Sequence, residues 1–226
     1  MPTLTDQHLS PAEVDQLVDS GEPVELVRCD LSGLRVRDAD LDDVVFTDCV
    51  LDGADLTGSR LSGAALRGGS ATWVRLERCD LTDARFERVD LSGAVLSGAL
   101  LTDAEFRSCR MTGARVEDTR GLGFLLLGCN AYGAELPGAV LSRRTHTGTR
   151  FTEANLAGAD LREAVLDGCV LLHADLTGAT LTGADLRGAD LGPCTRERLD
   201  ALAGAVLSTS QAVAALQDLT GAVVTD

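Results

Sequence analysis

The 226-residue chain has few aromatic side chains and no long apolar run, and each shortage excludes a class of function. Phe, Trp and Tyr make up 3 % of the residues, too few for the stacking platforms that hold nucleic-acid bases. No apolar stretch reaches the length of roughly 18 residues that a membrane-spanning helix needs, so the sequence predicts none. Basic residues are outnumbered: the net charge of −15 predicts repulsion from DNA and anionic membranes, and attraction to basic protein grooves.

Signals for export, metal binding and catalysis are also missing. The N-terminus has no basic-then-apolar run of a secretory signal, and the chain is expected to be cytoplasmic. The seven cysteines form no CxxC pair, and none has a histidine at ligand spacing. The three histidines (His8, His146 and His173) accompany no nucleophile–base pair or phosphate loop. We therefore expect no enzyme, and no catalytic residue, metal or cofactor.

What the sequence has in abundance is one period of five residues, which runs in a single register from Leu26 to Leu191. Of its 34 central positions, 23 hold Leu and seven more hold Phe, Val or Met. A small residue, most often Ala, stands two residues earlier, as in the unit Ala54–Gly58, which reads Ala-Asp-Leu-Thr-Gly. Because this period fits neither a helix nor a strand, it predicts a backbone that turns a corner every five residues, with one small and one large side chain pointing inward.

This unit resembles the A(D/N)LXX motif of pentapeptide-repeat proteins, over roughly three quarters of the chain. The resemblance implies an all-β solenoid, a right-handed quadrilateral parallel β-helix with four five-residue units in each coil. Phe46, Phe86 and Phe106 are separated by multiples of 20 residues, which supports that coil length. About eight and a half coils then form a rod ~40 Å long.

The cysteines share one place in this unit. All seven occupy the small inward position, at Cys29, Cys49, Cys79, Cys109, Cys129, Cys169 and Cys194. Cysteine is a small, often buried hydrophobe, so we interpret these residues as replacements for Ala in the core. Stacking of Cys29 on Cys49 makes a disulfide geometrically conceivable, but reduced thiols suit a cytosolic chain.

Both ends of the chain carry signals for short capping helices, which a solenoid needs over its open edges. Ser10–Glu13 reads as a capping box with Pro11 at the first helical position. It predicts a helix to about Asp19 that stops at Gly21. Its residues Val14, Leu17 and Val18 are expected over the first coil, and Leu9 with Val14 forms a hydrophobic staple.

Two helices are predicted at the C-terminal end. Thr195 begins one through Ala203, with Leu199 and Leu202 inward, and Ser208 begins another through about Leu219. The chain thus divides into an N-terminal capping helix (1–23), a pentapeptide-repeat β-helix (24–194) and a C-terminal helical segment (195–226). The last helix has an apolar edge, Val213, Leu216 and Leu219, which is either more cap or a homodimer contact. The resemblance favours the dimer, because topoisomerase-protecting members of the family dimerise through their C-terminal ends, and two-fold dimers are the commonest oligomers.

The repeat is least regular over residues 119–150, where the inward Leu is lost at Gly121, Ala131 and His146. One interpretation is an outward bulge with a solvated basic cluster; the other is a loop or basic spot that touches a partner. The cluster comprises Arg143, Arg144, His146 and Arg150. Trp73, at an outward corner, is either a binding hot spot or a cover for the gap at Ala71.

Counting in steps of one coil sorts the outward side chains onto four faces. One face, here called the acidic face, carries eight carboxylates and four arginines; it lies around Leu41, Leu61, Leu81 and Leu101. The face around Phe46 is neutral. The eight are Asp40, Asp42, Asp43, Asp80, Asp83, Asp103, Asp160 and Glu163.

The family resemblance also suggests a function. Qnr-type and mycobacterial fluoroquinolone-resistance proteins of this family resemble duplex DNA in width, handedness and charge. They bind DNA gyrase or topoisomerase IV and protect it from inhibitors. The resemblance thus implies a DNA mimic that binds a type II topoisomerase. A generic protein-interaction scaffold is the alternative. The long out-of-phase loops of Qnr-type members are missing here, so drug protection does not follow from the sequence.

Overall fold

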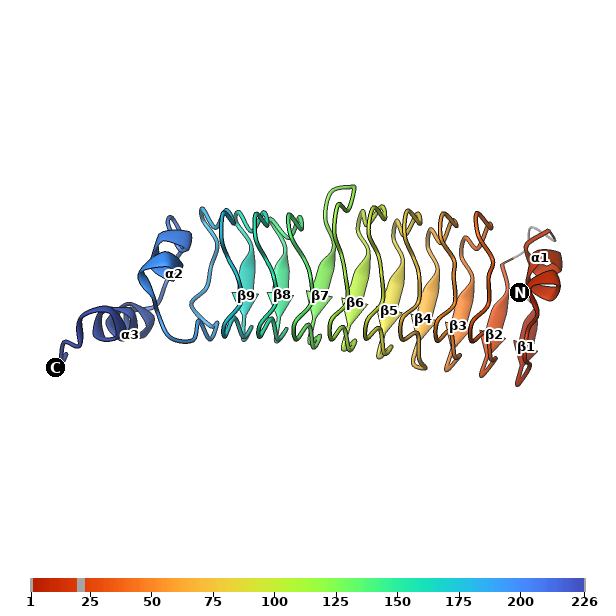
Figure 1. Ribbon diagram of the computed structural model, residues 1–226, viewed down its shortest axis with the longest axis horizontal. Helices are drawn as coiled ribbons and strands as arrows, with labels where there is room; N and C mark the ends of the chain where they lie inside the picture. The colour runs from red at the N-terminus through yellow and green to blue at the C-terminus, as the bar shows by residue number, and fades with distance from the viewer. Residues whose placement is uncertain (1, 20–22, 226) are drawn as a thin grey trace.

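The chain forms a rod built from stacked coils (Figure 1). The computed structural model describes residues 2–19 and 23–225, and within them nine short parallel strands stack in chain order into one sheet. They are β1 (Thr3–Thr5), β2 (Glu25–Val27), β3 (Val45–Thr47), β4 (Ala65–Arg67), β5 (Arg85–Glu87), β6 (Glu105–Arg107), β7 (Leu125–Leu127), β8 (Thr145–Thr147) and β9 (Val165–Asp167).

The register confirms the predicted coil length and with it the quadrilateral parallel β-helix. Phe46 pairs with Leu66 and Phe86 with Phe106 in the sheet. Single bridges on the other faces keep the same offset, as between Asp40 and Arg60. Along the regular part of the rod, each face is therefore hydrogen-bonded to the face of the next coil, and side chains stack on the equivalent residues of that coil.

The corners explain the recurrent glycine of the motif. The Ala54 N–H donates to the Leu51 carbonyl oxygen at 3.0 Å, which closes a turn in which Gly53 has a φ of 64°. A positive φ at the third position of such a turn defines type II and favours glycine. Several units have Asp or Arg at this third position instead. The left-handed conformation is sterically unfavourable for these residues, and glycine would avoid that strain.

The interior is a continuous column of the large and small inward residues. The Phe86 and Phe106 rings stack with centroids 4.7 Å apart, and the Phe124 ring meets that of Phe106 edge-on at 6.0 Å. All seven cysteines are buried free thiols, as predicted. Burial raises the pKa of the Cys79 thiol to about 12 and that of Cys49 to about 11, so both stay protonated.

The N-terminal end begins with half a coil that the sequence analysis did not anticipate. In the pairing of β1 with β2, Thr3 lies opposite Glu25. The sequence separation of these paired residues is larger than the separation between paired residues of the later strands. Helix α1 (Pro11–Asp19) follows β1 and replaces the rest of that coil. The Ser10 N–H donates to the Glu13 carboxylate at 2.8 Å, which is half of the predicted capping box, and Leu9 and Val14 are buried. Gly21 and the side chains of Leu17 and Val18, which the predicted cap included, lie outside the described residues.

The C-terminal end is closed by side chains that take the place of a next coil. Helix α2 (Arg196–Ala201) projects the Arg198 guanidinium to the carbonyl oxygens of Leu171, Ala174 and Leu191 at 2.9–3.1 Å. Helix α3 (Thr209–Thr220) begins with the predicted capping box, and its Gln211 amide donates to two further carbonyls of the last coil, at Leu186 and Ala189.

One prediction for this end was wrong. Leu199, expected to face inward, is 41 % exposed, whereas Leu202 is buried as predicted. The reason is that the Arg198 guanidinium occupies the side of α2 that faces the coil edge, because the open carbonyls need donors more than apolar cover.

The irregular segment forms an outward bulge between β6 and β7, drawn as the projecting green loop in Figure 1. Leu122 at this bulge is 76 % exposed, while Phe124 turns into the core. His146 does not belong to a surface cluster: it is fully buried, accepts from the Leu126 N–H at 3.3 Å and bonds the Leu141 carbonyl oxygen at 2.9 Å. Arg144 instead crosses the bulge to reach Asp103 at 2.6 Å.

Candidate protein-interaction surface

The acidic face contains carboxylates of two kinds, and the first kind serves the fold. Asp80 accepts from the Thr82 N–H at 3.0 Å and Asp160 from the Arg162 N–H at 3.1 Å. Asp40 makes the same, longer contact with the Asp42 N–H at 3.3 Å. This contact with the residue two positions on recurs at the Asp or Asn of many units, so the recurrent acid of the motif is a turn-stabilising residue.

Arginines neutralise much of the rest of the acidic face. Arg60 pairs with both Asp40, at 3.4 Å, and Asp42. The Arg162 guanidinium lies 2.8 Å from the Asp160 carboxylate, which lowers the pKa of that carboxyl to about 2. Further pairs join Arg143 to Glu163 and Arg144 to Asp103. The charge that a partner meets is therefore smaller than the sequence count indicates.

Asp43 and Asp83 are the carboxylates of the acidic face that remain for a partner. Both are exposed, and within residues 2–19 and 23–225 no ion pair or side-chain hydrogen bond reaches either of them. Both have a φ of 58°, in the region where Gly is the least strained residue. A left-handed conformation costs a non-glycine residue roughly 1–2 kcal/mol, somewhat less for Asp. Exposed acids on other faces, such as Asp38, Asp48 and Asp118, share this conformation, so it is the position on the acidic face that makes Asp43 and Asp83 candidates for function.

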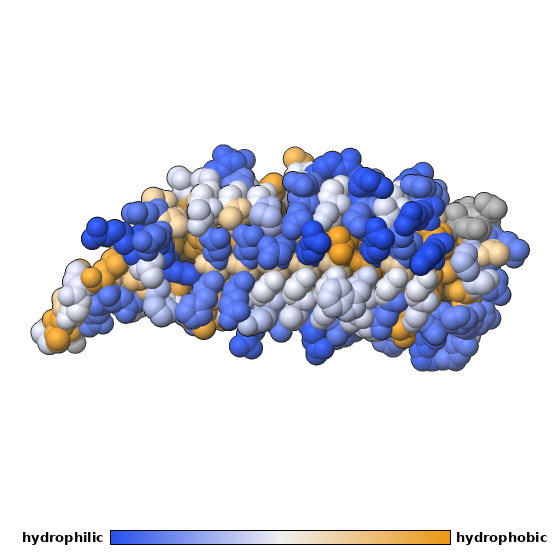
Figure 2. Space-filling model, in the orientation of Figure 1, coloured by the Kyte–Doolittle hydropathy of each residue, from blue (hydrophilic) through white to orange (hydrophobic). Residues whose placement is uncertain are grey.

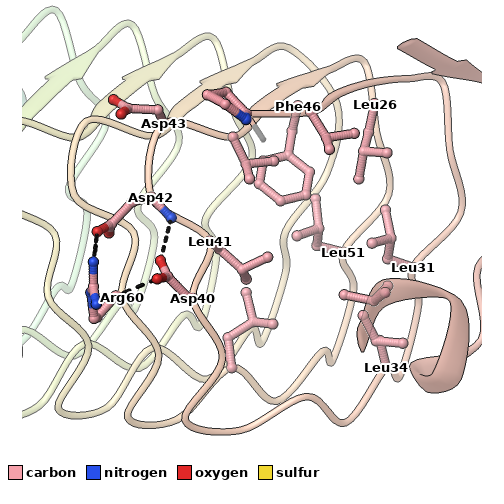
Figure 3. Close-up of a pocket in the computed structure, with 15 residues that line it drawn as sticks. Leu26, Leu31, Leu34, Asp40, Leu41, Asp42, Asp43, Phe46, Leu51 and Arg60 are labelled. Atoms are coloured by element: carbon pink, nitrogen blue, oxygen red, sulfur yellow. Dashed lines mark hydrogen bonds and ion pairs between the residues drawn. The ribbon is translucent and has the colours of Figure 1, made fainter. Parts of the chain in front are cut away.

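An apolar hollow opens beside Asp43, beneath the N-terminal cap (Figure 3). It measures about 180 Å³, and its wall is formed by side chains such as Leu31, Leu41 and Phe46. Asp40, Asp42, Asp43 and Arg60 stand at one side of it, as Figure 3 shows. The acidic face is thus not uniformly polar: at its N-terminal end, carboxylates border a space that accepts an apolar group.

Trp73 lies on a different face from these carboxylates. Its side chain is 70 % exposed, and a Cβ added to Gly93 would come within 2.5 Å of the ring, so the indole lies directly over that glycine. The ring covers the backbone of the next coil and leaves its other side to solvent. This contact means that Trp73 does not fill the gap at Ala71, which is itself fully buried.

Apolar side chains also gather at the C-terminal end. No residue of α3 is buried: Leu216 is 48 % and Leu219 37 % exposed, while Val213 is half-buried. Val206 and Val224, in the same C-terminal segment, are also exposed. Figure 2 shows hydrophobic colour at the tapering end that α3 and the C-terminal residues form. Two of the three predicted dimer-contact residues, Leu216 and Leu219, are therefore exposed, and Val213 is partly covered.

The sequence did not reveal an ion pair between the buried Asp55 and Arg37. Asp55, on the face around Leu56, is 4 % exposed and accepts from the Arg37 guanidinium at 2.9 Å and from the Thr57 hydroxyl at 2.6 Å. The Arg37 contact holds the pKa of the Asp55 carboxyl far below its ordinary value. The signal for this pair was a sequence spacing slightly shorter than one coil, which places Arg37 diagonally below Asp55 in the neighbouring coil.

Two kinds of feature are absent from the described parts of the chain. Residues 2–19 and 23–225 contain no group of three or more His, Cys, Asp or Glu placed to hold an ion. Among the same residues, no helix has the length and apolar character to cross a bilayer.

Four-sided coils with one small and one large inward residue define a class of parallel β-solenoids, and comparisons with known families agree. A model described as a pentapeptide repeat region matches residues 22–96, and one for pentapeptide repeats matches 79–118 and 154–192. The chain belongs to the pentapeptide-repeat family. No curated protein sequence matches it.

Solved structures of two QnrB1 variants show the same fold. A trypsin-treated variant of QnrB1, a plasmid-mediated fluoroquinolone resistance protein, is 21 % identical, with a TM-score of 0.54, and the alignment covers 100 % of this chain and 99 % of that one. Another trypsin-treated variant gives 22 % identity, coverage of 99 % and 97 %, and a TM-score of 0.52. HetL from the cyanobacterium Nostoc sp. strain PCC 7120, described as involved in heterocyst differentiation regulation, is 28 % identical over 83 % of this chain and 86 % of its own, with a TM-score of 0.44.

Proposed function

We propose that this protein is a non-enzymatic, cytoplasmic DNA mimic that binds a type II topoisomerase, DNA gyrase or topoisomerase IV, and modulates it. The observation that carries the proposal is the pair Asp43 and Asp83, which keep unneutralised charge at strained corners of one face. A protein that binds duplex DNA presents basic side chains at the spacing of the phosphates. An acidic rod can enter such a groove, and the likeness in fold to QnrB1 supports this partner.

The hollow beneath the N-terminal cap extends the proposed contact. Asp40, Asp42 and Asp43 border an apolar space. Such a site suits the side chain of an arginine or lysine, whose aliphatic stem packs on apolar groups while its cation meets carboxylates. We propose that the acidic face contacts the enzyme through Asp40, Asp42, Asp43, Asp80, Asp83, Asp103, Asp160 and Glu163, with the unpaired members contributing most.

The experiment is a gyrase supercoiling and quinolone-stabilised cleavage assay with two matched quadruple variants. The first changes Asp40, Asp43, Asp80 and Asp83 to Asn, which keeps the turn contacts, as Asn130 and Asn155 do elsewhere in the rod. The second makes four acid-to-amide changes on the neutral face, at Asp48, Glu87, Glu105 and Asp167. We expect inhibition or protection that weakens with salt and is lost in the first variant alone. Equal behaviour of the two variants would refute recognition through one face.

We further propose that two copies associate through α3. The exposed Leu216 and Leu219 form an apolar surface that association would cover. Leu216→Asp should give a smaller particle in sedimentation, with an unchanged β-helix by circular dichroism. An unchanged sedimentation coefficient of Leu216→Asp would contradict the C-terminal dimer.

The second candidate function is a protein-interaction scaffold for another partner. The ion pairs favour it, because Arg60, Arg143, Arg144 and Arg162 offset about half of the negative charge of the acidic face, which weakens any likeness to the phosphates of DNA. If wild-type protein leaves supercoiling and cleavage unchanged at micromolar concentration, the scaffold is the remaining hypothesis.

A further inference from the structure

The two ends of the rod differ in how their backbone edges are treated. At the C-terminal end, the Arg198 and Gln211 side chains donate to five carbonyls of the last coil. At the N-terminal end, β1 is the last strand of the stack, and α1 is drawn above it (Figure 1). Within the described residues, no hydrogen bond reaches the outer edge of β1. An open strand edge is a template for pairing with another chain.

The residues that face this open edge follow from the register. The Glu25 N–H donates to the Pro2 carbonyl oxygen at 2.9 Å, and the Asp6 N–H donates to the Val27 carbonyl oxygen at 3.0 Å. Backbone groups alternate between the two edges of a strand, and the pairing of Leu4 with Leu26 lies between these two bonds. The N–H and C=O groups of Thr3 and Thr5 therefore point away from β2, toward solvent.

The edge is complementary to itself. Its sequence, Thr-Leu-Thr, reads the same in both directions. An antiparallel pair of two β1 strands around a two-fold axis at Leu4 places each Thr3 opposite the partner's Thr5, with their N–H and C=O groups facing each other. Opposed threonines are a favourable cross-strand pair, and Leu4, which packs on the core, meets its own copy.

Polar side chains beside the edge are held by contacts within their own rod, which leaves the backbone groups of Thr3 and Thr5 accessible. Asp6 binds Arg28 at 2.7 Å, His8 lies 3.2 Å from Asp30, and Glu25 accepts from the Thr3 hydroxyl at 3.3 Å. We propose that the N-terminal edge is an interface at which β1 pairs antiparallel with β1 of a second copy, so that the sheet continues from one rod into the next.

Pairing through β1 goes beyond the proposed function and does not depend on it. The dependence of this pairing on salt also has the opposite sign to that of topoisomerase binding. Each rod carries a net charge of −15, so two rods repel at long range. Salt screens that repulsion, so head-to-head association should strengthen as salt rises, whereas binding of the acidic face to a basic groove should weaken. Together with the C-terminal contact, such pairing would produce chains of rods.

Sedimentation of the full chain carrying Leu216→Asp tests the N-terminal interface without the C-terminal one. We expect a reversible monomer–dimer equilibrium that strengthens with salt. Adding Thr5→Pro removes an outward N–H and none that bonds to β2, and should lower the association constant by about tenfold or more. The matched control, Thr5→Ala, keeps that N–H and should associate like its parent. A Leu216→Asp chain that stays monomeric up to about 1 mM in high salt would overturn the proposal, as would equal association of the proline and alanine variants.

Hydrogen exchange gives a second measurement that does not rely on a proline variant folding. In the Leu216→Asp chain, the amide protons of Thr3 and Thr5 should exchange more slowly as protein concentration rises. The Asp6 amide, already bonded to Val27, serves as the internal control and should not change with concentration. Concentration-independent exchange at Thr3 and Thr5 would contradict the interface.

Discussion

His146 makes the stability of the rod depend on pH, and its replacement by Leu tests this directly. The imidazole is fully buried and holds its place by two hydrogen bonds, from the Leu126 N–H and to the Leu141 carbonyl. Burial disfavours the charged ring, and the nearby Arg144 adds to the effect, so the pKa of His146 is lowered in the folded protein.

The sign and size of the effect follow from the difference in bound protons. An unfolded histidine takes up a proton near pH 6.5, while the folded ring stays neutral to lower pH. The unfolded state therefore binds more protons, and stability falls as pH drops from 6.5 toward the folded pKa. The slope approaches about 1.4 kcal/mol per pH unit, which amounts to up to about 2 kcal/mol between pH 7 and pH 5.

Urea unfolding at pH 7, 6 and 5 measures this loss in wild-type protein and in His146→Leu, which restores the usual inward residue of the repeat. The variant should have a flatter pH dependence, by up to about 2 kcal/mol over this range. His173→Asn is the matched control, because His173 is exposed at a corner with a φ of 57° that Asn tolerates. If His146→Leu and wild type lose stability in parallel, the buried neutral imidazole is refuted.

Three further outcomes test the core. Native protein should react slowly with a thiol reagent and quickly once unfolded, because its seven thiols are buried; fast native labelling of several would refute their inward placement. Leu81→Ala and Phe86→Ala should each lower the free energy of unfolding by roughly 2–5 kcal/mol, and a loss under about 0.5 kcal/mol at both would mean that the register is wrong. Val44→Leu, which adds one methylene beside the hollow, should stabilise by about 0.8 kcal/mol, whereas the matched Ala84→Val in the filled mid-rod should destabilise by about 1–3 kcal/mol; equal effects would show that the hollow is filled.

The solenoid could be predicted because one local rule, repeated every five residues, decides both the turn and the burial. The pairing of Phe86 with Phe106 and the burial of Cys109 follow directly from counting in steps of one coil. The ends could not be predicted as well, because the rule stops there. Strand β1 pairs with β2 outside the regular offset, and Leu199 gives way to an arginine that satisfies open carbonyls.

The candidate site was predicted in composition but not in electrostatics. Counting placed eight carboxylates on one face, but long arginine side chains reach across coils in ways that no period specifies. Arg144 shows this best, since its side chain crosses the bulge to Asp103 from a position where the motif expects a small inward residue. Only side-chain geometry separates paired acids from the unpaired Asp43 and Asp83.

Competition with duplex DNA distinguishes a DNA mimic from a protein that binds elsewhere on the enzyme. Fluorescence anisotropy of a labelled duplex bound to DNA gyrase can be followed while unlabelled protein is added. A DNA mimic should displace the duplex competitively, less so at higher salt, and the variant with amides at Asp40, Asp43, Asp80 and Asp83 should displace little. A ternary complex, in which the protein and the duplex occupy the enzyme together without loss of anisotropy, would contradict DNA mimicry.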